Sequence, residues 1–102
     1  SSEEDMLLAR DGKLASVDAL IQLTHSRIDS TEARLREYAA EAAEFERSGK
    51  PVPAVLQEQI KTARELITDN REFIQEKETE RQEITARFNA DMIRYRELTE
   101  TD

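Results

Sequence analysis

The chain has 102 residues, of which 37% are hydrophobic and 37% charged, and its formal net charge is −8. So few apolar residues can fill a seam between helices but not a thick globular core, and the acidic balance opposes binding along a nucleic-acid backbone. The sequence has no cysteine, which excludes disulfides and thiolate zinc sites, and no apolar run long enough for a membrane span.

Residues 3–47 carry a stripe with the spacing of a heptad repeat. Its members step by three and four residues, which keeps one face of a helix against a partner. The stripe consists of Leu7, Arg10, Leu14, Val17, Ile21, Thr24, Ile28, Thr31, Leu35, Tyr38, Ala42 and Phe45. At the start, Ser1 or Ser2 with Glu4 or Asp5 forms a candidate capping box. We therefore expect a helix over residues 3–47.

Residues 48–53, with the sequence SGKPVP, contain both prolines and one of the two glycines. Gly49 suits the left-handed residue that ends a helix. Pro51 and Pro53 suit the first turn of a new helix, where a missing N–H group costs nothing. A connection this short is typical of antiparallel neighbours, so we expect a turn that folds the chain back on itself.

Residues 53–99 repeat the pattern of the first arm, without any glycine or proline after Pro53. The second stripe consists of Leu56, Ile60, Ala63, Ile67, Asn70, Ile74, Lys77, Arg81, Ile84, Phe88, Asp91, Tyr95 and Leu98. The sequence thus predicts an all-α fold. We expect one domain over residues 1–102, a long antiparallel two-helix coiled-coil hairpin with helices over 3–47 and 53–99.

The centre of this hairpin is expected to contain six large aliphatic residues, namely Ile21, Ile28, Leu35, Ile67, Ile74 and Ile84. Polar residues interrupt the stripes at Thr24, Thr31, Asn70, Lys77 and Arg81. Such residues lower stability but fix register and partner number. The pattern leaves two registers open, one with Leu14 opposite Ile84 and one with Leu14 opposite Asp91.

Each arm has more apolar residues than one seam needs. The additional ones, placed beside the stripes, are Leu20, Leu23, Leu66, Phe73, Met92 and Ile93. A broad stripe is typical of a helix that touches two neighbours. We therefore expect these six residues to mediate self-association, with two hairpins forming a four-helix bundle.

Few residues are candidates for chemistry. His25, the only histidine, lies four residues before Asp29, and we interpret the pair as surface residues and not as metal ligands. Arginines at a spacing of seven flank both stripes, at Arg27 and Arg34, Arg64 and Arg71, and Arg87 and Arg94. Pairing between the helices explains them better than phosphate binding. We expect no cofactor, no bound metal and no catalysis.

The sequence therefore favours a non-enzymatic coiled-coil interaction module, a scaffold, spacer or adaptor that acts through self-association. Its expected partner is a second copy, or another helical protein. One alternative is a helical arm that binds nucleic acid or a ribonucleoprotein through its arginine edges, although the charge leads us to expect no nucleic acid. Another is a regulatory appendage of a larger protein. We expect a soluble chain, in the cytoplasm rather than secreted.

Overall fold

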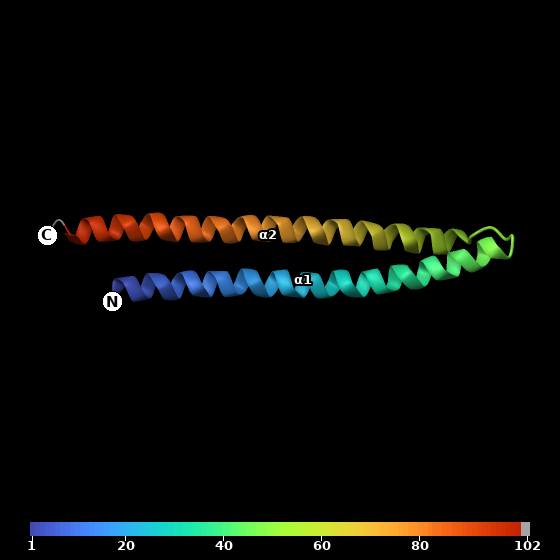
Figure 1. Ribbon diagram of the computed structural model, residues 1–102, viewed down its shortest axis with the longest axis horizontal. Helices are drawn as coiled ribbons and strands as arrows, with labels where there is room; N and C mark the ends of the chain where they lie inside the picture. Colours follow the sequence, from blue (N-terminus) through green and yellow to red (C-terminus); the bar gives the residue numbers. More distant parts are fainter. Residues whose placement is uncertain (101–102) are drawn as a thin grey trace. The chain divides into compact units, whose positions relative to one another are not determined.

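A computed structural model describes residues 1–100, in which all regular structure is helical. Helix α1 spans Ser2–Arg47 and helix α2 spans Ala54–Glu100, and the chain reverses direction between them (Figure 1). The all-α prediction of two long helices that form a hairpin is confirmed. Both helices lie within about one residue of the expected bounds.

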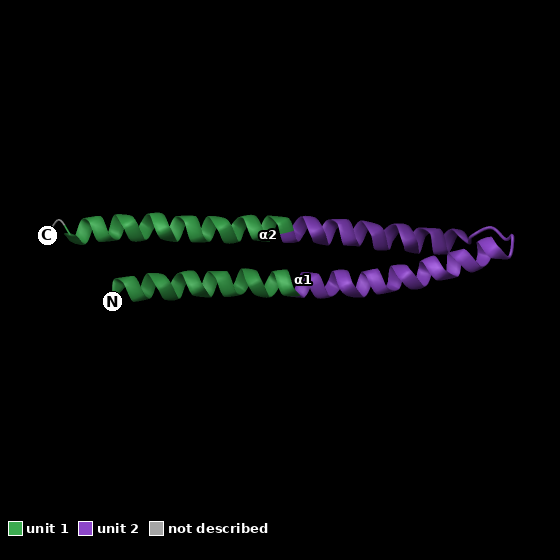
Figure 2. Ribbon diagram, in the orientation of Figure 1, with its two compact units in different colours: residues 1–22, 75–102 green, residues 23–74 purple. Residues whose placement is uncertain are grey.

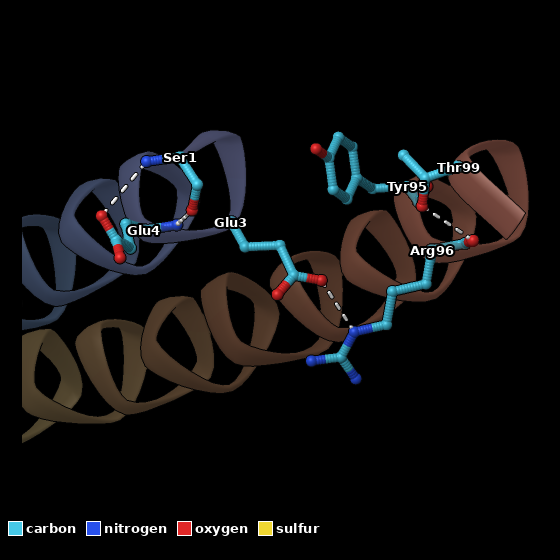
Figure 3. A network of polar contacts seen from close by, with 6 residues as sticks. All are labelled: Ser1, Glu3, Glu4, Tyr95, Arg96 and Thr99. Atoms are coloured by element: carbon cyan, nitrogen blue, oxygen red, sulfur yellow. Dashed lines mark hydrogen bonds and ion pairs between the residues drawn. The ribbon is translucent and has the colours of Figure 1, made fainter.

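Helix α1 begins with a capping box. The Ser1 hydroxyl accepts a hydrogen bond of 3.3 Å from the Glu4 amide, and the Ser1 amine donates one of 3.1 Å to the Glu4 carboxylate (Figure 3). Of the candidate capping residues, Ser1 and Glu4 form the cap in the structure. Three acidic residues in the first turn, Glu3, Glu4 and Asp5, add a favourable interaction with the helix dipole.

Helix α1 ends in a Schellman motif around Gly49. The Gly49 amide donates to the Glu46 carbonyl at 3.1 Å, and the Lys50 amide donates to the Phe45 carbonyl at 2.9 Å. The φ angle of Gly49 is 69°, in the left-handed region where a side chain would be strained. The role expected of Gly49 is therefore the one it has in the structure.

The prolines lie just before α2. The Pro53 carbonyl accepts the first helical hydrogen bond, of 3.0 Å, from the Gln57 amide, and the Gln57 side chain donates to the Val52 carbonyl at 3.2 Å. The expectation that Pro51 and Pro53 occupy the first turn of the helix is wrong by a small margin, because Pro53 is the cap of α2 and Ala54 is its first residue. Each proline forces the residue before it, Lys50 or Val52, away from helical geometry.

The chain divides into two compact units (Figure 2). Residues 23–74 form the turn unit, which contains the end of α1, the turn and the start of α2. Residues 1–22 and the chain from residue 75 onward form the terminal unit. In each unit a segment of α1 packs against a segment of α2, and the two units are described separately below.

The core of the turn unit follows the two stripes. Its buried residues are Thr24, Ile28 and Thr31 on α1 and Leu56, Ala63, Ile67 and Ile74 on α2. Leu35 and Asn70 are half-buried. The Thr31 hydroxyl donates to the Arg27 carbonyl at 2.9 Å, so its burial leaves no unsatisfied donor. The stripe positions of this unit are thus occupied as the heptad pattern predicts.

In the terminal unit Phe88 and Tyr95 keep their expected stripe positions and are half-buried, but the position between them changes by one residue. Val17 and Met92 are buried, and Met92 is only 6% exposed, whereas Asp91 is exposed. The expectation that Asp91 lies in the stripe with Met92 beside it is therefore wrong. A straight helix with 3.6 residues per turn drifts from a strict heptad repeat, so either position can face the partner. Burying a thioether costs far less than burying a carboxylate, so Met92 turns inward.

Two contacts in the terminal unit decide between the two registers. Arg81 Nε donates to Asp18 Oδ1 at 2.9 Å, and the Arg10 guanidinium lies 4.4 Å from the centre of the Phe88 ring. These contacts place residue 18 near residue 81 and residue 10 near residue 88. Leu14 lies midway between Asp18 and Arg10 along α1, and Ile84 lies about midway between Arg81 and Phe88 along α2, so Leu14 and Ile84 are opposite each other. The structure therefore favours the register with Leu14 opposite Ile84 and excludes the one with Asp91.

Polar stripe residues of α2 reach acidic partners at the surface. Lys77 is half-buried and its ammonium donates to the Glu80 carboxylate at 2.9 Å. Arg81 is exposed and crosses to Asp18 on α1. At the end of this unit, Arg96 Nε donates to Glu3 Oε1 at 3.0 Å and ties the two helices together (Figure 3). These long side chains extend to solvent and keep their charges hydrated.

Candidate interaction surface

The turn unit has two edges where α1 and α2 meet, and they differ in chemistry. A residue that immediately precedes a stripe residue lies on one edge, and a residue that immediately follows one lies on the other. Thus Arg34 and Leu66 precede Leu35 and Ile67 and line the same hollow, although they come from different helices.

Charged residues dominate one edge, which is called the charged edge. It includes Glu32 and Arg36 from α1 and Arg64 and Arg71 from α2, which line a hollow of about 650 Å³. Arg71 Nη2 donates to Glu32 Oε1 at 3.2 Å and bridges the two helices. Arg71 thus pairs across the helices as expected.

The opposite side of the turn unit, called the apolar edge, holds three of the six expected self-association residues, Leu23, Leu66 and Phe73. It contains a hollow of about 350 Å³ lined by Thr31, Arg34 and Tyr38 from α1 and by Val55, Glu58, Gln59, Thr62, Ala63 and Leu66 from α2. Leu23 and Phe73 precede Thr24 and Ile74 and therefore project from the same side. The apolar edge is defined here by Leu23, Val55, Leu66 and Phe73.

The side chains of this edge are accessible to a partner. Leu23 is 48% exposed, Leu66 is 45% exposed and Val55 is 70% exposed, while Phe73 is half-buried. A single exposed apolar residue is ordinary on a protein surface, whereas several on one side of a helix pair mark a candidate contact surface. The edge therefore combines apolar side chains with a shallow hollow.

The remaining expected residues lie in the terminal unit. Leu20 is 41% exposed and precedes Ile21, so it occupies the same kind of position as Leu23. Ile93 is 60% exposed but follows its buried neighbour Met92, and it therefore faces the other way. Met92 itself is buried in the stripe and has no surface to offer a second chain.

Sequence reasoning missed Val55. It falls within the expected helix over residues 53–99 but was not among the six flanking residues, although it precedes the buried Leu56 just as Leu66 precedes Ile67. Its distance of eleven residues from Leu66, three helical turns, was the signal that could have identified it. Leu8, in the terminal unit, is 71% exposed and was not among the expected residues. Leu98 was expected in the stripe of the second arm, but it is 63% exposed and this expectation is wrong.

The candidates for chemistry lie apart from this surface. His25 and Asp29 are exposed and each follows a buried stripe residue, Thr24 or Ile28, so they lie on the charged edge. Among residues 1–100, no group of three or more side chains is placed to bind a metal. In the same part of the chain, neither helix has a stretch apolar enough to cross a membrane.

Comparisons with known proteins add no family to this description. The chain matches no protein-family model, no curated protein and no solved structure.

Proposed function

We propose that the chain is a non-enzymatic helical interaction module that acts through self-association, as a scaffold, spacer or adaptor. The observation that carries this proposal is the exposure of the apolar edge. Leu23, Val55 and Leu66 face solvent although the stripe between α1 and α2 is already filled by Ile28, Ile67 and other residues. The edge is thus a second apolar surface beyond the one that the hairpin needs.

A second copy of the chain is the partner for which each apolar residue of this edge contributes to the contact on both chains. Burying one Leu or Phe side chain completely is worth roughly 1.5–3 kcal/mol, and part of that remains available at each half-exposed position. A two-fold dimer buries every residue of its contact twice. Two turn units packed edge to edge place four helical segments around one apolar centre, which is the arrangement of a four-helix bundle.

The non-catalytic part of the proposal rests on the residue types available. The chain has a single histidine and no cysteine. Its many carboxylates, such as Glu37, Glu41 and Glu44, follow helix surfaces and are exposed. Acid–base catalysis requires a carboxylate held beside a bound substrate, and solvent-facing positions along a helix do not form such a site.

Thermal unfolding at different protein concentrations tests self-association. If two copies bind each other only when folded, raising the concentration about hundredfold above the dissociation constant stabilises the folded state by about 2.7 kcal/mol. The midpoint of the circular dichroism melt should then rise by several degrees. A midpoint that does not change between low and high micromolar concentration would contradict the proposal, because the folding of a monomer does not depend on concentration.

A further inference from the structure

The charges on the apolar edge differ between its two helices. Over residues 23–34 of α1, the charged residues that precede stripe positions are Arg27 and Arg34. Over residues 66–73 of α2, the only such residue is Asp69. Over these two stretches the edge therefore has a basic side on α1 and an acidic side on α2, with the apolar residues Leu23, Leu66 and Phe73 between and beside them.

Arg27 and Asp69 are available for a partner. Both are exposed, and neither forms an ion pair within the described residues. On the charged edge, by contrast, Arg71 already pairs with Glu32. Arg27 and Asp69 are thus two charges beside the apolar edge that can pair with a second chain.

The charge pattern selects one way of joining two copies. Packing α1 against the partner's α1 would bring arginines together, and packing α2 against the partner's α2 would bring Asp69 close to its own copy. Packing α1 against the partner's α2 instead brings opposite charges together on both sides of the two-fold axis. Because Arg27 and Asp69 lie at similar distances from the turn, this pairing requires both turns to point in the same direction.

We propose that a second copy binds the apolar edge in this orientation, with residues 23–34 of α1 against residues 66–73 of the partner's α2. Arg27 then faces Asp69 of the second copy, and Leu23 packs against the second copy's Phe73. This inference rests on the proposed self-association, to which it adds the contact surface and the orientation. The two charge pairs lie at the rim of the contact, where they set register and specificity more than affinity.

Reversing each charge separately and then mixing the two variants tests the orientation. In a dimer of the Arg27→Glu variant, the introduced glutamate faces Asp69 at both rim contacts, so both contacts join two acids. In a dimer of the Asp69→Arg variant, the introduced arginine faces Arg27 at both contacts, so both join two bases. Each variant alone should dimerise about tenfold more weakly than the unmodified chain, because exposed ion pairs and repulsions contribute a few tenths to one kcal/mol each and two contacts change. An equimolar mixture should recover, because both contacts in the mixed dimer join opposite charges.

Native mass spectrometry on variants of different mass counts the mixed dimers directly. Matched controls are Arg36→Glu and Asp29→Arg, which make the same charge changes on the charged edge and are both exposed. The controls should dimerise like the unmodified chain, and their mixture should give the random proportion of mixed dimers. A preference for the mixed dimer that only the Arg27 and Asp69 variants show supports the proposed orientation.

Other outcomes separate the two proposals. If both single variants dimerise as tightly as the unmodified chain, or weaken without recovering on mixing, the orientation is wrong while self-association stands. If the unmodified chain is a monomer at high micromolar concentration, both proposals fail, and the apolar edge is then a surface for a different protein.

Discussion

Replacing Ile28 by Asp should destabilise the turn unit by about 4 kcal/mol or more, among the largest effects expected of a single substitution. Ile28 is only 6% exposed and lies in the stripe between buried Thr24 and Thr31. The substitution removes a large aliphatic side chain from the contact with α2 and puts a carboxylate in its place. The carboxylate must either lose its hydration or force the helices apart.

The matched control for this prediction is Ser26→Asp. Ser26 is exposed and lies two residues before Ile28 on the same helix, so it tests the cost of an added charge without a change in the core. Urea unfolding followed by circular dichroism at one protein concentration should show a much lower midpoint for Ile28→Asp and a nearly unchanged one for Ser26→Asp. Equal midpoints for the two variants would show that Ile28 is not a core residue.

Replacing Leu66 and Phe73 together by Asp should weaken self-association by at least about hundredfold while both helices remain largely formed. The two residues lie two helical turns apart on the apolar edge, where Leu66 is 45% exposed and Phe73 is half-buried. In a two-fold dimer the change places four carboxylates in the contact. The buried neighbours Ile67 and Ile74 are unaltered, so the stripe within each chain persists.

The control for this double variant changes the residues on the other side of the same stripe positions. Thr68 and Gln75 are exposed, follow Ile67 and Ile74, and are also two turns apart. Thr68→Asp with Gln75→Asp therefore adds the same two charges to the same helix but leaves the apolar edge intact. Analytical ultracentrifugation should show dissociation of the first double variant only. Equal association of the two would show that the apolar edge is not the contact.

Much of this fold could be predicted because local sequence and long-range packing agree. The heptad spacing of Ile28, Ile67 and Ile74 requires one face of each helix to be covered, and all three are buried. Gly49 and the two prolines stop one helix and start the next for reasons that depend only on backbone geometry. These features need no knowledge of the partner helix.

The errors arose where two neighbouring residues could serve the same position. Asp91 and Met92 both fit a stripe that drifts along a straight helix, and only the cost of burying a charge separates them. The register was ambiguous because aliphatic residues in the two arms match in more than one alignment. It is set by particular long side chains, in the Arg81–Asp18 ion pair and the contact of Arg10 with Phe88.

The candidate surface was predicted in part for a similar reason. Flanking positions of a heptad are easy to recognise, so Leu23 and Leu66 were found from the sequence and are exposed. Which of the two edges such a residue joins depends on whether it precedes or follows its stripe residue. Ile93 follows the buried Met92 and therefore lies on a different side from Leu20, which precedes Ile21. Val55 precedes Leu56 and therefore lies on the apolar edge with Leu23 and Leu66.

Sedimentation equilibrium of the unmodified chain tests the central claim, self-association, most directly. A solution examined from low to high micromolar concentration should move from a mass of 11.8 kDa, that of one chain, to twice that value and should stop there. A closed two-fold dimer leaves no further apolar edge, so no larger species is expected. A mass of 11.8 kDa throughout the whole range would contradict the claim.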